Sequence, residues 1–97
     1  MAVYVDPMSP CIQSKKWPYD QACHLIADSV EELQEFAMTL GLHPSWFQAA
    51  GGSMPHYDLV GSMRRRAIRL GAIQIDRKEF VKIMEKYRQR KTGGRRD

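Results

Sequence analysis

The side chains that can exchange protons or bind an anion are concentrated in two short stretches of this sequence. One is "CHLIAD", which contains His24, and the other is "PHYDL", which contains His56 and Asp58. A neutral imidazole acts as an acid or a base near pH 7, and a nearby carboxylate can assist it or bind a metal ion. We therefore predict that His24, His56 and Asp58 are the catalytic residues of a polar pocket.

Other residue types in the chain suit a phosphorylated ligand. Arginine binds phosphate through a fixed pair of N–H groups, and Arg65 and Arg69 share one face of a helix as an i, i+4 pair. Aromatic rings offer a stacking surface for a nucleobase. The predicted ligand-binding residues are Asp6, Asp28, Trp46, Gln48, Tyr57, Arg65 and Arg69.

Two mechanisms are compatible with these residues. His24, His56 and Arg65 around one cleft would support metal-independent cleavage of a phosphodiester. Alternatively, Asp28, His56 and Asp58 would hold a divalent metal ion. The sequence has no H-E-x-x-H, G-x-x-x-x-G-K-S/T or G-x-G-x-x-G motif, so it identifies neither a cofactor nor a reaction.

Each residue also has an ordinary structural explanation. A lone histidine in a strand, such as His24, is more often hydrogen-bonded within the core than catalytic. Trp17 and Trp46 would serve equally well to anchor loops, and Asp58 would serve to cap the following helix. These alternatives stay open at the level of sequence.

The two cysteines, Cys11 and Cys23, do not form a disulfide framework or a C-x-x-C pair, so no structural zinc site is predicted. A nucleophilic Cys23 assisted by His24 is disfavoured, because adjacent strand residues point to opposite faces. Reduced thiols are typical of a cytoplasmic protein.

The elements that must position these residues follow from hydrophobic periodicity, caps and turns. Ser29 with Glu32, and Asp76 with Glu79, are helix-start signals, and Gly41 is a helix stop. Residues 8–21 form a long loop, and 49–55 form a turn with a double glycine at its tip. The predicted strands are 2–7, 22–27, 45–48 and 72–76, and the predicted helices are 29–40, 61–70 and 77–90.

The order strand-strand-helix-strand-helix-strand-helix predicts an α/β fold, with α+β as the alternative. We expect a single small sheet of about four strands covered by three helices, with parallel pairs in its second half. If the strands end near Asp6, Asp28 and Gln48, these residues gather at one sheet edge. Residues 1–91 are predicted to form one domain, and 92–97 a basic flexible tail.

Charge divides the chain into two parts. Residues 1–59 carry two basic and seven acidic side chains, whereas 60–97 carry thirteen basic and four acidic ones. A basic half of this kind attracts phosphates, nucleic acid or an acidic protein partner. No apolar run approaches the roughly 18–20 residues that span a bilayer, and the N-terminus is not a signal peptide, so no membrane association is expected.

Several phrases occur together in a recognisable order: "MAVYVDP", "CHLIADSVEELQEFAMTLGL", "SWFQ", "PHYDL" and "RRRAIRLGAIQIDRKEF". Over about residues 1–84 the chain resembles the small bacterial and phage family catalogued as domain of unknown function four thousand and thirty-one. The resemblance implies a soluble intracellular protein and no established activity. The motif positions are Asp6, Pro7, Cys23, His24, Asp28, Trp46, Phe47, Gln48, Pro55, His56, Tyr57 and Asp58.

This chain departs from the family pattern after "HYDL", where members often carry Thr-Pro. Here Val60 and Gly61 occupy those positions, which removes the capping hydroxyl and leaves Ser62 as a later cap. An anion site built on the N-terminus of that helix is correspondingly weaker.

Three functions from different classes follow. The first is a pocket that binds a nucleotide or another phosphorylated ligand, either with or without processing it. The second is a protein-interaction module, for instance a phage- or bacteria-encoded modulator of a host enzyme. The third is a nucleic-acid-binding protein that uses the basic C-terminal half. The sequence does not determine the oligomeric state.

Overall fold

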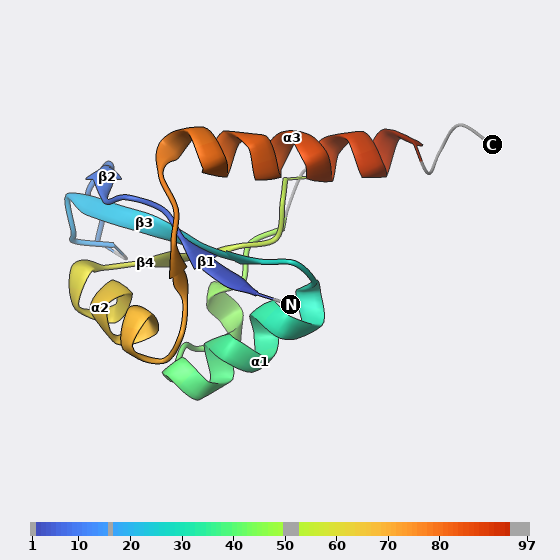
Figure 1. Cartoon of the computed structure of the whole chain (residues 1–97). Helices are drawn as coiled ribbons and strands as arrows, with labels where there is room; N and C mark the ends of the chain where they lie inside the picture. Colours follow the sequence, from blue (N-terminus) through green and yellow to red (C-terminus); the bar gives the residue numbers. More distant parts are fainter. Residues whose placement is uncertain (1, 16, 50–52, 94–97) are drawn as a thin grey trace.

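The computed structural model of the chain describes residues 2–15, 17–49 and 53–93. They form a mixed five-stranded sheet with three helices, in an α+β arrangement. One helix crosses one face of the sheet, and the other two cover the opposite face (Figure 1). The prediction of a single small sheet covered by three helices is therefore confirmed.

The central strand is β3, which pairs with three others. It is antiparallel to β1, with Val5 opposite Leu25, and antiparallel to β4 on its other side. Its first residues pair with the short β2, and β5 adds to β1 as the parallel pair. The strands are β1 (Val3–Val5), β2 (Ser9–Pro10), β3 (Gln21–Ala27), β4 (Tyr57–Leu59) and β5 (Ile73–Gln74).

This topology corrects two expectations. The parallel pair joins the first and last strands, so the expected parallel pairs within the second half of the chain are wrong. Because β1 and β3 are antiparallel, Asp6 and Asp28 lie at opposite ends of the sheet. The backbone N–H of Asp28 donates to the carbonyl of Ala2, at the start of β1, and that of Asp6 donates to the carbonyl of His24.

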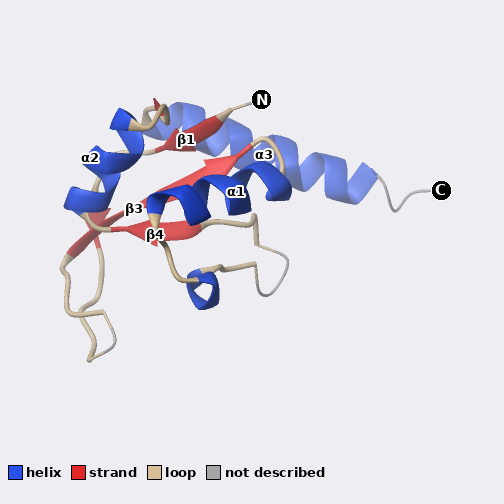
Figure 2. Ribbon diagram, turned by 90° about the horizontal axis from the view of Figure 1, so that it is seen from below, coloured by secondary structure: helices blue, strands red, loops and turns tan. Residues whose placement is uncertain are grey.

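Two helices, α1 (Val30–Leu40) and α2 (Gly61–Arg69), lie on one face of the sheet, as Figure 2 shows from below. The Ser29 hydroxyl accepts the backbone N–H of Glu32, and Gly41 ends α1 with a φ of 92°, as the sequence predicts. Helix α2 has no side-chain cap. The main core lies between these helices and the sheet and includes Val5, Cys23, Leu25, Leu33, Ala37, Leu40, Tyr57, Leu59 and Ala67.

The third helix, α3 (Arg77–Gly93), crosses the opposite face. Asp76 and Glu79 form the predicted capping pair at its start, each accepting the other's backbone N–H. Phe80 is the anchor of the helix, because it is buried with Ile26 and Ile75. This smaller cluster fixes the first turns of α3 over the middle of β3.

Besides β2 and β4, for which no strand was predicted, two further segments differ from the sequence prediction. The predicted strand 45–48 is a short 3₁₀ helix, η1 (Pro44–Trp46), which is followed by an isolated bridge between Gln48 and His56. Pro44 at the first helical position favours this turn over a strand. The tip of the turn at 50–52 lies outside the described residues.

At the C-terminus, α3 continues past the predicted end near Arg90 to Gly93. The predicted tail therefore starts inside the helix, and residues 94–97 lie outside the described residues. Within the described part of the chain, no helix combines the length and the apolar character needed to cross a membrane.

Candidate metal centre

A row of polar side chains runs across three neighbouring strands on the face covered by α3. His24 of β3 is the register partner of Asp58 in β4, and Asp6 follows β1 directly opposite His24 on the other side. Because side chains alternate between the two faces of a sheet, His56 lies on the same face as Asp58, two residues away. Gln48 joins the row through its bridge with His56.

His24 is held on two sides. Its Nδ1 lies 2.9 Å from Oδ2 of Asp6, and its backbone N–H donates to Oδ1 of the same carboxylate at 2.6 Å. The ring stacks on Phe80, with 4.9 Å between ring centroids and 16° between planes. The hydrogen bond to Asp6 raises the pKa of His24, although its partial burial acts in the opposite direction.

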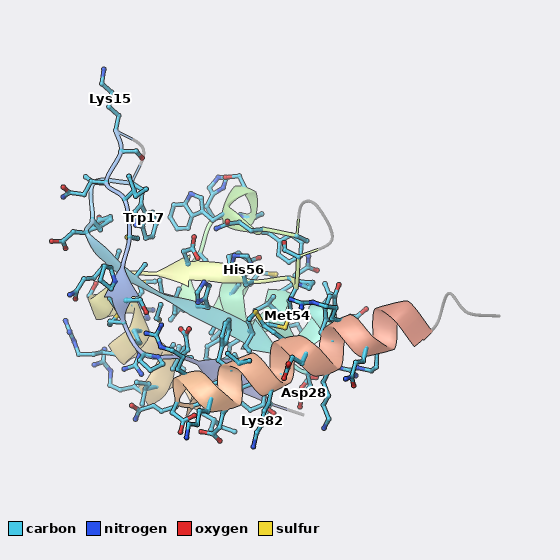
Figure 3. The ribbon with its side chains drawn as sticks, turned by 90° about the horizontal axis from the view of Figure 1, so that it is seen from above. Lys15, Trp17, Asp28, Met54, His56 and Lys82 are labelled. Atoms are coloured by element: carbon cyan, nitrogen blue, oxygen red, sulfur yellow. The ribbon has the colours of Figure 1, made fainter. Side chains whose placement is uncertain are left out.

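His56 is fixed by its own turn. Its Nδ1 donates to the backbone carbonyl of Met54 at 2.8 Å, which leaves Nε2 as the nitrogen with a lone pair. Nε2 lies 3.8 Å from Oδ1 of Asp58. The ring meets His24 edge to face, with 5.4 Å between centroids (the position of His56 beside α3 is shown in Figure 3).

Asp58 completes the group. Gln48 donates from Nε2 to Oδ2 of Asp58 at 2.7 Å. The other carboxylate oxygen, Oδ1, faces the imidazole of His56. His24, His56 and Asp58 each offer one ligand atom, and these three atoms lie within 4.8 Å of one another. The three residues are neither fully buried nor fully exposed.

This geometry fits a metal ion. Metal-binding histidines characteristically donate their second ring N–H to a carboxylate or a backbone carbonyl, and such partners fix the ring and its tautomer. Asp6 does so for His24, and the Met54 carbonyl does so for His56. Tetrahedral zinc requires ligand atoms about 3.3 Å apart at its bond lengths of about 2.0–2.1 Å. Since the three atoms lie within 4.8 Å of one another, binding would draw them together by up to about 1.5 Å.

A pocket of about 370 Å³ opens beside this group, between the sheet and the 11–20 segment that joins β2 to β3. His24 and Asp58 form part of its wall, together with Pro10, Cys11 and Trp17. The pocket therefore places two of the three candidate ligands in contact with a space large enough for a small molecule.

Two of the predicted ligand-binding residues, both aromatic, lie away from the candidate ligands. Tyr57 lies between His56 and Asp58 in the chain, so it points to the opposite face, where it is buried against Phe47 and where burial raises its pKa. Trp46 is exposed in η1, beside His43. Neither aromatic ring lines the pocket next to His24.

The remaining acid and the arginines are also distant from the candidate ligands. Asp28 accepts a hydrogen bond from the Tyr4 hydroxyl at 2.9 Å, and Figure 3 shows it across α3 from His56. Arg65 and Arg69 are exposed on α2, which packs on the other face of the sheet. The structure thus brings together His24, His56, Asp58, Asp6 and Gln48 and does not bring together Asp28, Trp46, Tyr57, Arg65 or Arg69.

Several groups that contact the candidate site residues were not predicted from the sequence. The Met54 carbonyl carries no side-chain signal, and the stack of Phe80 on His24 joins residues far apart in the chain. Arg64 was missed as well, and its Nε donates to the carbonyl of Asp6 at 2.9 Å.

Burial raises the pKa of Cys23 to about 12, with the charge of Asp6 as the second cause, so this residue is not a nucleophile at neutral pH.

One protein family matches this chain. The model of a family described as "Protein of unknown function (DUF4031)" matches residues 3–87, and the chain therefore belongs to that family. No curated protein and no solved structure matches.

Proposed function

We propose that this DUF4031 chain binds a divalent transition-metal ion through His24, His56 and Asp58, and uses it to bind and hydrolyse a phosphate ester. The observation that carries the proposal is the convergence of three ligand atoms within 4.8 Å, each on a side chain whose other polar atom is already held. The groups that hold these three side chains in place are Asp6, the Met54 carbonyl and Gln48.

The ligand types favour zinc, manganese, iron or cobalt. Imidazole nitrogen suits these ions, whereas calcium and magnesium prefer sites made of oxygen alone. Three protein ligands leave at least one coordination position for water or substrate, as in catalytic zinc sites. The pocket beside His24 and Asp58 gives a substrate access to that position.

A metal ion held in this way would supply a water of lowered pKa and a positive charge for a phosphoryl oxygen. In hydrolysis the oxygen of a water would bond to phosphorus, the bond to the ester oxygen would break, and a proton of that water would pass to the leaving alcohol. The residues of the chain orient the site: Asp6 holds His24, and Gln48 holds Asp58.

Metal-independent cleavage by His24, His56 and Arg65 is less well supported. Arg65 lies on α2, across the sheet from the two imidazoles, so it cannot stabilise a phosphate between them. Among the cations near the pocket, Arg77 donates to the Ser9 hydroxyl at 3.0 Å, and Ser9 lines the pocket.

The test has two parts. Titration with Zn²⁺ or Mn²⁺ in a calorimeter should give one site per chain. Hydrolysis of bis(p-nitrophenyl) phosphate should then require that metal and be lost in His56→Ala. His43→Ala is the matched control, because His43 is exposed and its Nδ1 contacts Ser45 instead of the site. A chain that binds no divalent metal would remove the proposal.

We also propose that the chain works in a reducing compartment such as the cytoplasm. The two free cysteines, Cys11 and Cys23, support this location.

A further inference from the structure

Several internal hydrogen bonds hold the 11–20 segment, which carries the outer wall of the pocket. The Cys11 N–H donates to the Asp20 carbonyl at 2.9 Å, and the Gln13 side chain donates to the Pro18 carbonyl at 2.8 Å. The Trp17 N–H donates to the Ser14 hydroxyl, and the Trp17 carbonyl accepts the Ser14 N–H. The loop is therefore a formed wall of the site.

Trp17 is the aromatic side chain that this loop contributes to the pocket wall, beside Cys11 and Ile12. Its ring packs edge to face on Tyr19, with 5.2 Å between centroids, and it lines the same pocket as His24 and Asp58. It is half-buried, and Figure 3 shows it in the loop at one edge of the molecule, on the same side of α3 as His56. An indole held in this way is a preorganised flat surface beside the metal ligands.

Three chemical features border the pocket. The proposed metal centre would bind phosphoryl oxygen, the Arg77 guanidinium on the pocket-lining Ser9 attracts negative charge, and the indole offers a flat apolar face. Its volume of about 370 Å³ exceeds what a phosphate group alone would fill. A ligand that uses all three features carries a phosphate next to a planar ring.

We propose that the ligand is a nucleotide unit, with its phosphate at the metal centre and its base stacked on Trp17. This inference rests on the proposed function and deepens it by naming the substrate class. A free mononucleotide and a nucleotide within a single strand share this chemistry, and the experiment separates the two sources.

The test uses Trp17 as its own reporter. Trp46→Phe leaves Trp17 as the one tryptophan of the chain, and Trp46 does not line the pocket. Fluorescence of this Zn²⁺-loaded variant is followed by rapid mixing, before any hydrolysis, with adenosine monophosphate or with ribose 5-phosphate. The second compound lacks only the base.

We expect adenosine monophosphate to quench the fluorescence and to bind about 10- to 100-fold more tightly than ribose 5-phosphate, the range that stacking on an aromatic ring supplies. In the otherwise wild-type chain, Trp17→Ala should bring the affinity for adenosine monophosphate, measured by calorimetry, down to that for ribose 5-phosphate. Trp17→Phe should keep most of the difference, because it retains a ring.

Equal affinities for the two compounds, or an unchanged preference in Trp17→Ala, would overturn the inference. If the metal-loaded chain still cleaves bis(p-nitrophenyl) phosphate in that case, the proposed function survives alone. If Zn²⁺ does not bind at all, both fail together. If the base preference is present, the binding of hexathymidylate separates the two sources. Binding much tighter than that of adenosine monophosphate, and weakening steeply as salt rises, assigns the nucleotide to a single strand. Binding equal to or weaker than that of adenosine monophosphate assigns it to a free nucleotide.

Discussion

His24 and Asp58 are direct partners in the antiparallel register of β3 and β4, so their side chains leave adjacent strands on the same face of the sheet. Such pairs have Cβ atoms about 4.5–5.5 Å apart. Asp6 stands on the other flank of His24 and orients its ring. The candidate metal centre is thus built on strand pairing, which holds ligands more accurately than loops do.

Removal of any one candidate ligand should weaken metal binding sharply. We expect His24→Ala, His56→Ala and Asp58→Ala each to lower Zn²⁺ affinity by more than about 100-fold, since even an outer-shell partner contributes about 10–100-fold. Competition with a chromophoric chelator measures the affinity. Retention of near wild-type affinity in two of the three variants would contradict the assignment.

The role of Asp6 differs from that of a ligand. Asp6→Ala leaves the Nδ1–H and the backbone N–H of His24 without their acceptor, so we expect Zn²⁺ affinity to fall by about 10–100-fold and stability to fall by about 1–3 kcal/mol. Asp6→Asn keeps one carbonyl acceptor and should recover part of the affinity. Chelator competition and urea unfolding measure the two effects.

Asp28→Ala is the matched control for Asp6. It removes a carboxylate at the other end of the sheet, where Asp28 accepts from the Tyr4 hydroxyl. Zn²⁺ affinity should stay unchanged. A loss equal to that of Asp6→Ala would show that charge alone, and not the contact with His24, accounts for the effect.

The position of α3 depends on Phe80. Its ring is nearly buried between Ile26 and Ile75 and stacks on His24, so Phe80→Ala should reduce the free energy of unfolding by about 3–5 kcal/mol. Val81→Ala, at an exposed neighbouring position, should change it by no more than about 0.5 kcal/mol. Urea denaturation monitored by circular dichroism compares the two, and equal losses would contradict the packing described for α3.

The two thiols should react differently. Burial, with the charge of Asp6 as the second cause, raises the pKa of Cys23 to about 12, so at pH 8 only about one Cys23 in ten thousand is a thiolate. Cys11 is half-buried in the loop and remains accessible. A chromogenic disulfide reagent should titrate one thiol in the folded chain and two in guanidinium chloride. Rapid reaction of both thiols in the folded chain would be incompatible with this account.

Much of the fold could be predicted because its signals are local. The capping pairs that start α1 and α3 and the glycine that ends α1 fix helix ends within a few residues of sequence. The alternation in β3 also places His24 and Cys23 on opposite faces, as observed.

The parts of the site that could not be predicted depend on pairing between distant strands. The antiparallel register brings Asp6 to His24 and carries Asp28 to the far end of the sheet, and no local pattern encodes that register. Tyr57 is a different case. Once "PHYDL" is recognised as ending in a strand, alternation alone turns Tyr57 away from its two neighbours.

Helix α2 shows why a run of arginines misleads. Ala67 is buried against the main core, which orients the helix and leaves Arg65 and Arg69 exposed on the face away from the imidazoles. We therefore expect the double variant Arg65→Ala, Arg69→Ala to retain metal-dependent phosphodiester hydrolysis within about threefold, since exposed charges are screened across such distances. A loss as complete as that of His56→Ala would place these arginines at the site after all.

The most direct test of the metal centre is anomalous X-ray scattering at the zinc edge from crystals of the chain grown with one equivalent of Zn²⁺. We expect one peak per chain, about 2.0–2.2 Å from one ring nitrogen of His24, from Nε2 of His56 and from a carboxylate oxygen of Asp58. A peak at His43 or at a contact between molecules, with none between β3 and β4, would contradict the account.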